Sequence, residues 1–167
     1  MFHKIAYISY KDEDLELRNR SISILNDFFL DEKYVIQNES TGIIFVASGG
    51  SEKIAVKLAN TIYDVVLLCH RESNSYAATI EIASYLRDKG KRVNIIDVMV
   101  TNAYSEFLDI LKVNSAIELL SNQKSAVIGE VSDWLINSDM LESTVKEKIG
   151  VELLRLPWSK LDDYRKK

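Results

Sequence analysis

The residues of this sequence best suited to chemistry follow three short apolar runs, each set beginning where its run ends. After residues 42–47 the candidates are Ser48, Gly49, Gly50, Ser51 and Glu52. After residues 64–69 they are His70, Asn74 and Ser75. After residues 125–129 they are Glu130, Ser132, Asp133 and Trp134. Hydroxyls, carboxylates, amides, imidazoles and indoles orient polar small molecules in binding sites, so we take these as candidate substrate-binding residues.

The Gly49-Gly50 turn matches neither of two common phosphate-binding loops. A dinucleotide site needs G-x-G-x-x-G and a Walker loop needs G-x-x-x-x-G-K-[ST], whereas this segment is S-G-G-S-E. Glu52, in the first turn of the helix expected next, is favoured by the helix dipole but repels an incoming phosphate. A neutral polyol is therefore the more natural ligand. The structural alternative is a tight strand-to-helix turn in which Ser51 or Glu52 caps the helix.

His70 follows the second apolar run and is a candidate acid/base group or hydrogen-bond donor to a substrate hydroxyl. The alternative is a turn histidine whose ring nitrogens are satisfied inside the protein. Asn74 and Ser75 can cap the next helix while offering their side chains to a ligand. Cys69, which follows two leucines, is expected in the core.

Residues 129–135, GEVSDWL, combine carboxylates, a hydroxyl and an indole. An aromatic face beside carboxylates suits a sugar, whose C–H face stacks on the ring while its hydroxyls donate to the acids. In the structural alternative, Trp134 packs into the core and Asp133 caps the following helix. The sequence shows no Cys/His cluster with metal-ligand spacing, and no nucleophile–histidine–acid set can be assembled from it with a supporting motif.

The elements that position these residues alternate between strand and helix along the whole chain. Short apolar runs at 4–10, 42–48, 64–70, 92–99, 125–130 and 151–156 predict strands, with another at 34–38, and amphipathic stretches lie between them. This alternation predicts an α/β fold, with an open, mostly parallel sheet and helices on both faces, in one Rossmann-like or flavodoxin-like domain over residues 1–167. The three candidate sets are then expected along one edge, outside the carboxyl ends of the strands.

The composition excludes several classes of partner. The formal charge is -4, and no basic stripe precedes the terminal RKK, so nucleic acid is not expected. The apolar runs are too short to span a bilayer, and the N-terminus lacks the apolar core of a signal peptide. A single cysteine fits a reducing compartment. We expect a cytoplasmic protein.

Several segments in register resemble the N-terminal domain of proteins related to L-fucose and L-arabinose isomerases. They are FVASGGSE, LLCHRESNSYAATIEIASYLRDKG, VIGEVSDWL and VKEKIGVELLRLPWSKL. In that family a TGGSE-like turn, an H-x-x-x-N-S stretch before a helix and a GExSDWL loop recur in this order. The resemblance covers nearly the whole chain from about residue 4. Val131 stands where a proline is common, and RES replaces a more usual Pro-Xaa-Asn run after His70.

The resemblance implies an aldose–ketose isomerase that works through an ene-diol with a divalent metal, commonly manganese. In that family the acidic residues and histidine that hold the metal belong to later domains, and we expect this chain to be either a fragment that stops before them or a stand-alone domain. We therefore expect no cofactor and no isomerisation in these residues alone. The implied role is to help complete a sugar pocket with further domains or a neighbouring subunit of a homo-oligomer. All of the candidates named above except Ser48 match the family's motif positions.

Two other functions stay open at this stage. One is a small Rossmann-like enzyme that acts on a phosphorylated or nucleotide-linked substrate, with His70 as the acid/base group. The other is an interaction module that assembles a sugar-metabolising complex through an exposed helix.

Overall fold

The computed structural model of the chain describes residues 2–10, 14–30, 33–39, 41–132, 134 and 142–160. The candidate Asp133 lies outside these described residues. By its internal contacts the chain divides into two compact units, Met1–Ile110 and Leu111–Lys167. Residues 1–167, expected as one α/β domain, thus hold two units, and each is described by itself.

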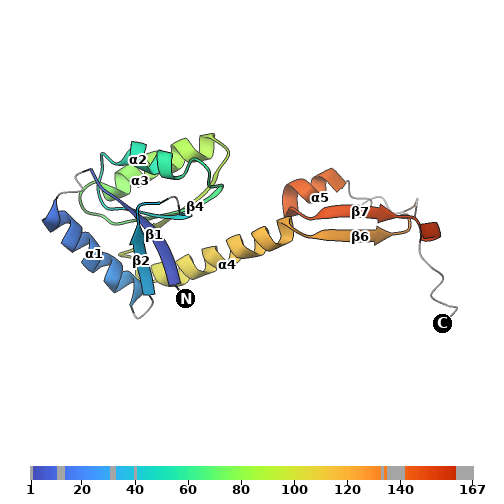
Figure 1. The fold of residues 1–167 in the computed structure, drawn as a ribbon, viewed down its shortest axis with the longest axis horizontal. Helices are drawn as coiled ribbons and strands as arrows, with labels where there is room; N and C mark the ends of the chain where they lie inside the picture. Colours follow the sequence, from blue (N-terminus) through green and yellow to red (C-terminus); the bar gives the residue numbers. More distant parts are fainter. Residues whose placement is uncertain are drawn as a thin grey trace. The chain divides into compact units, whose positions relative to one another are not determined.

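The first unit is built on a five-stranded parallel sheet (Figure 1). Its strands are β1 (Phe2–Ile8), β2 (Lys33–Gln37), β3 (Ile43–Val46), β4 (Asp64–Cys69) and β5 (Arg92–Asp97). The strand order is β2-β1-β3-β4-β5, and every neighbouring pair is parallel. This is the flavodoxin-like order of an open α/β sheet, which confirms the predicted fold class.

Helices cover both faces of this sheet. They are α1 (Leu15–Phe29), α2 (Glu52–Leu58), α3 (Ser75–Asp88) and α4 (Ala103–Ser121), whose first residues belong to this unit. The chain moves from β1 to β2 in one direction and from β3 to β5 in the other. Because such crossovers are right-handed, α1 lies on one face while α2 and α3 lie on the opposite face (Figure 1).

Each face has its own buried layer. Beneath α2 and α3 the layer is aliphatic, with Ile8, Ile44, Leu67 and Ile82 among its members. The face beneath α1 is aromatic and includes Phe28, Phe29, Tyr104 and Phe107, with ring centroids 4.8–6.1 Å apart in each contacting pair. The apolar runs of β3 and β4 are buried on both faces, as strands between two helical layers must be.

The second unit contains a smaller parallel sheet. The end of α4 leads into β6 (Lys124–Ile128), α5 (Glu142–Ile149), β7 (Glu152–Leu156) and the short 3₁₀-helix η1 (Trp158–Lys160). In the part of the chain that the structure describes, β6 and β7 pair only with each other. The expectation of one sheet edge for all strands was therefore wrong. The physical reason is composition, because KSAVI and ELLRL contain charged residues and are largely exposed, unlike the continuous apolar strands of a buried parallel sheet.

Over the described ranges, none of the helices is both long enough and apolar enough to cross a bilayer.

Candidate functional site

The Gly49-Gly50 turn lies at the topological switch point of the large sheet. β1 and β3 are neighbours, but the chain leaves them in opposite directions, towards β2 and towards β4. Ligands of open α/β sheets bind outside the carboxyl ends of the strands at such a point. The segments that follow the two strands touch, since the Tyr10 backbone N–H donates to Ser48 Oγ over 2.9 Å. The first candidate set is therefore at the position where this fold class binds ligands.

Gly50 is required for a close approach to an aromatic ring. Its φ of +84° is left-handed, and a Cβ built on it would stand 2.7 Å from Cδ2 of Tyr10. The Tyr10 side chain is 68 % exposed, so its ring rests against the glycine and is otherwise open to solvent. The turn thus seats an exposed aromatic side chain beside the topological switch point.

Gly49 joins the first and second candidate sets. Its N–H donates to the Ser73 carbonyl over 2.9 Å. A Cβ at this glycine would lie 3.0 Å from Cβ of Asn74. The loops that follow β3 and β4, about two dozen residues apart in sequence, are therefore in direct contact at one edge of the sheet, as predicted.

Glu52 occupies the place where a bound anion would be expected in this turn. Its Oε1 accepts a hydrogen bond of 3.1 Å from the Gly50 N–H. Ser51 is fully buried, and its hydroxyl donates to the Ser48 carbonyl over 2.8 Å instead of capping α2. Because a carboxylate of the protein already accepts from the glycine amide, an incoming phosphate would meet both a used donor and a like charge.

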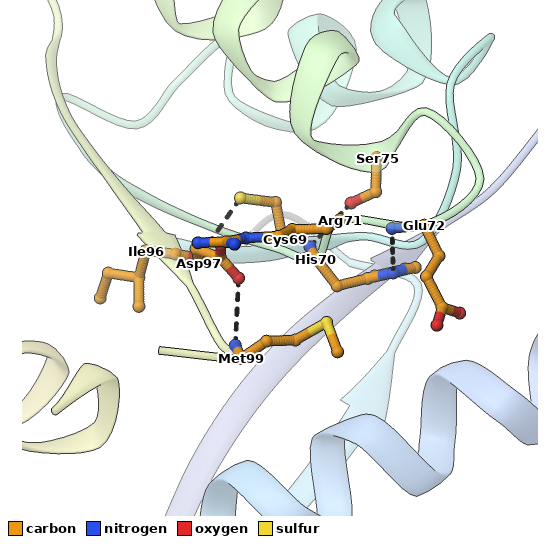
Figure 2. Close-up of polar contacts among 8 residues, drawn as sticks. All are labelled: Cys69, His70, Arg71, Glu72, Ser75, Ile96, Asp97 and Met99. Carbon is orange, nitrogen blue, oxygen red and sulfur yellow. Dashed lines mark hydrogen bonds and ion pairs between the residues drawn. The ribbon is translucent and has the colours of Figure 1, made fainter. Parts of the chain in front are cut away.

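His70 is held on both sides of its ring. A carbonyl oxygen can only accept, so Nε2 carries the proton and donates to the Ala47 carbonyl over 3.0 Å. Nδ1 accepts from the Glu72 N–H over 3.3 Å (Figure 2). The ring is 1 % exposed and stacks on Phe45 with centroids 5.7 Å apart. Nε2 thus ties the loop to the end of β3, while Nδ1 fixes the turn of the loop itself.

Burial lowers the pKa of His70 from its ordinary value of 6.5, because a charged imidazolium loses hydration there. The Ala47 carbonyl and the charges of Glu72 and Asp97 act in the opposite direction, and Arg20 adds to the lowering. His70 is therefore neutral at pH 7. A neutral ring with both nitrogens bonded positions the loop rather than transferring protons.

Ser75 and Asn74 have different environments although they are adjacent. Ser75 begins α3 and is fully buried, and its Oγ donates to the Val46 carbonyl and accepts from the His70 N–H over 3.1 Å. Asn74 is left-handed, with a φ of +57°, and exposed, and its side chain makes no capping hydrogen bond. Ser75 is thus bonded within the protein, whereas the Asn74 amide is presented to solvent.

Two ion pairs that the sequence did not indicate hold the same loop. Arg20 of α1 makes a bidentate contact with Glu72, from Nη2 to Oε1 at 2.8 Å and from Nε to Oε2 at 2.6 Å. Arg71 contacts Asp97, at the end of β5, over 2.7 Å (Figure 2). Arg20 also lines a shallow, open pocket with Asp14, Glu16, Leu17 and Ser73. Arg20 and Glu72 are 52 positions apart, so no local pattern could have revealed their contact.

Cys69 lies in the core, as predicted. Its thiol is buried and donates to the Ile96 carbonyl at 3.4 Å (Figure 2). Burial, helped by the charge of Asp97, raises the pKa of Cys69 to about 12. A thiol with this pKa is not a nucleophile at neutral pH.

The third candidate set follows β6 and so belongs to the smaller sheet. Glu130 is exposed, Ser132 is half-buried and Trp134 is 80 % exposed. The alternative that Trp134 packs into the core is wrong. The structure thus brings the first two sets together at one edge, while the third follows a strand of a different sheet.

The divalent metal of the resembled family finds no cluster of ligands in the part of the chain that the structure describes. Among the described residues, His, Cys, Asp and Glu do not gather in any group of three that could hold an ion. The expectation that later domains supply the ligands stays a prediction.

Comparison with known proteins adds no relative. No protein-family model matches the sequence, and a search of the curated proteins finds no significant match. The resemblance to the sugar isomerases therefore rests on the motifs quoted above.

Proposed function

We propose that this chain is a sugar-recognition domain related to the N-terminal domains of L-fucose and L-arabinose isomerases, and that it is not catalytic by itself. The observation that supports this most is the meeting of the loops after β3 and β4 at the β1/β3 switch point. This is where α/β sheets bind small molecules. The edge there carries the exposed ring of Tyr10, the exposed side chain of Asn74 and the half-buried side chain of Glu52.

The chemistry of this edge favours a neutral, hydroxyl-rich ligand. Glu52 accepts hydrogen bonds, the Asn74 amide both donates and accepts, and the face of Tyr10 attracts the weakly positive C–H groups of a sugar ring. Phosphate is disfavoured because Glu52 already holds the Gly50 N–H. The bonded, neutral His70 argues against a small acid/base enzyme.

A ligand screen by thermal unfolding tests the proposal. The ligands are free pentoses and hexoses, sugar alcohols, sugar phosphates and nucleotides, each with and without Mn²⁺. A ligand at about ten times its Kd adds roughly 1.4 kcal/mol of stability, which raises Tm by about 3–6 °C for a chain of this size. We expect shifts with free sugars or polyols. Shifts confined to nucleotides or phosphates would overturn the proposal and favour the small-enzyme alternative.

Glu52→Ala locates the binding edge. Removing the carboxylate takes away a hydroxyl acceptor while leaving the buried Ser51 and Ser75 contacts in place, so the sugar-induced shift should shrink by at least half. The matched control is Glu81→Ala, which removes an exposed carboxylate from α3. Equal shifts for the two variants would place the ligand elsewhere.

An assembly function is the second candidate, and the second unit supports it. Val113, Leu119, Ile128 and Leu154 are 41–67 % exposed there, so their apolar side chains are available to an interface. Light scattering on the purified chain measures its mass. A stable oligomer without ligand, combined with no response to any sugar, would favour assembly over recognition.

A further inference from the structure

The indole of Trp158 lies across Gly129 in the second unit. A Cβ built on Gly129 would stand 2.2 Å from Nε1, 2.7 Å from Cε2 and 3.1 Å from Cδ1 of this ring. These three atoms belong to the five-membered ring, so the ring covers the position that a side chain would take. Gly129 has a left-handed φ of +83°. Only glycine combines this φ with room for the indole.

The backbone fixes this contact. β6 and β7 are in register at Ile128 and Leu156, so Gly129 and Pro157 begin the two segments beyond the sheet. The Gly129 N–H donates to the Leu156 carbonyl over 2.9 Å. One residue beyond Pro157, Trp158 begins the turn η1, in which the Lys160 N–H donates to the Pro157 carbonyl over 2.9 Å. The indole is thus seated at the carboxyl end of the pair.

The rest of the ring is open to solvent. Trp158 is 70 % exposed although one side rests on Gly129. Glu130, the next residue after that glycine, is also exposed. A fixed indole with a free face, and an exposed carboxylate on the residue after Gly129, supply the two contacts that a sugar uses, its C–H face on the ring and its hydroxyls on the acid.

We propose that the free face of Trp158 is a carbohydrate-stacking subsite, with Glu130 accepting from the hydroxyls of the same sugar. The proposal rests on the sugar-recognition function above and adds a residue that the sequence motifs did not single out as a ligand contact. The first unit repeats the arrangement at the β1/β3 switch point, where the exposed Tyr10 ring rests on the left-handed Gly50.

Fluorescence can test the subsite directly, because the chain has two tryptophans, Trp134 and Trp158. In Trp134→Phe the emission comes from Trp158 alone. In Trp158→Phe it comes from Trp134 alone. Titration of Trp134→Phe with the free sugars of the thermal screen should give a saturable change in the emission of Trp158. Titration of Trp158→Phe with the same sugars measures any response of Trp134, itself a candidate binding residue, separately.

Affinity gives a second measurement. An aromatic contact of this kind is expected to change Kd by about threefold to tenfold, so Trp158→Ala should weaken sugar binding by that factor. Trp158→Tyr keeps an aromatic face and should restore most of the affinity. Leu119→Ala, which removes an exposed apolar side chain from the same unit, is the matched control and should leave Kd within twofold.

The outcomes separate this inference from the function on which it rests. If sugars raise Tm but Trp158→Ala keeps the parental Kd and Trp158 emission does not respond, the subsite is overturned and the sugar-recognition function stands. If no sugar raises Tm or changes either emission, both are overturned. Where Trp158→Ala fails to fold by circular dichroism, the Trp158→Tyr and Trp134→Phe titrations decide.

Discussion

Two exposed aromatic side chains in this molecule rest on left-handed glycines, Tyr10 on Gly50 in one unit and Trp158 on Gly129 in the other. Both glycines lie just beyond the carboxyl end of a parallel strand. Their surroundings differ. Near Gly50, the polar side chains of Ser51 and Ser75 are buried and bonded to backbone carbonyls, whereas Glu130, next to Gly129, is exposed.

The difference shows that polar residues after parallel strands serve two purposes. Around the first glycine, His70 and Ser75 tie the β4–α3 loop to β3, so their polar atoms shape the edge instead of contacting solvent. Around the second glycine, the carboxylate of Glu130 is exposed and is therefore available to a ligand. A motif can therefore match a binding family in both places, although only some of its residues contact the ligand.

The largest expected loss of stability follows the removal of His70, whose two ring nitrogens are hydrogen-bonded. His70→Ala leaves the Ala47 carbonyl and the Glu72 N–H without partners and opens a cavity, so it should lower the free energy of unfolding by about 3 kcal/mol. Trp134→Ala should change it by less than about 0.5 kcal/mol, as substitutions of exposed residues do. Urea unfolding followed by circular dichroism compares the two. A similar loss of stability in His70→Ala and Trp134→Ala would show that the hydrogen bonds of His70 do not distinguish it from an exposed residue.

Gly50→Ala should lower the free energy of unfolding by about 2 kcal/mol, because it adds a close contact with Tyr10 to the strain of a left-handed alanine. Gly90→Ala is the control, since Gly90 has a φ of +78° and nothing within 4 Å of its built Cβ. It should cost about 1 kcal/mol from strain alone. Adding Tyr10→Ala to Gly50→Ala should recover the difference, and no recovery would mean that the ring does not rest on this glycine.

Acidification should lower the free energy of unfolding through the protonation of His70. The pKa of His70 is lower in the folded chain than its unfolded value near 6.5, so the unfolded state takes up a proton first as pH falls. Stability is full above about pH 6.5 and decreases below it by at most about 1.4 kcal/mol per pH unit, until the folded pKa is passed. Urea midpoints at several pH values should fall less steeply for His70→Gln. If the urea midpoints of the parent protein and of His70→Gln fell in parallel as pH decreases, His70 would not be the group responsible.

The smallest expected effect compares one ion pair from each unit. The two-branched Arg20–Glu72 contact is partly shielded, with side chains 66 % and 33 % exposed, whereas Lys124 and Glu152 meet at 3.1 Å with 63 % and 45 % exposed. Arg20→Met should cost roughly 0.5–1 kcal/mol and Lys124→Met about 0–0.5 kcal/mol. Urea unfolding in low salt measures the loss of stability in each variant. A loss for Arg20→Met no larger than that for Lys124→Met would show that the loop does not depend on Arg20.

Much of the large sheet could be predicted because its physical cause is local. Continuous apolar runs at β3 and β4 identify strands buried on both faces, and turn residues mark where they end. The strand order could not be predicted, since periodicity does not record the direction of each crossover. β6 and β7 alternate with a helix like the other strands, so only their charged residues distinguished them.

The sequence predicts where in the fold the candidate residues lie better than it predicts which atoms they contact. Placing Gly49 and Asn74 at one edge follows from parallel topology, and the structure confirms it. Whether the ring of His70 points inward, or which distant residue pairs with Glu72, depends on packing that no short motif encodes. Trp158 was part of a quoted motif, but nothing in its spacing shows that Gly129 lies beneath it.

The buried thiol of Cys69 makes the chain a convenient scaffold for site-directed labelling. It is the sequence's single cysteine, and with a pKa of about 12 it stays protonated and unreactive towards maleimides at neutral pH. The native protein is in practice a cysteine-free background. One new cysteine at Glu81, or one at Lys124, would carry a dye or spin label into a chosen unit without removing a native residue of the core.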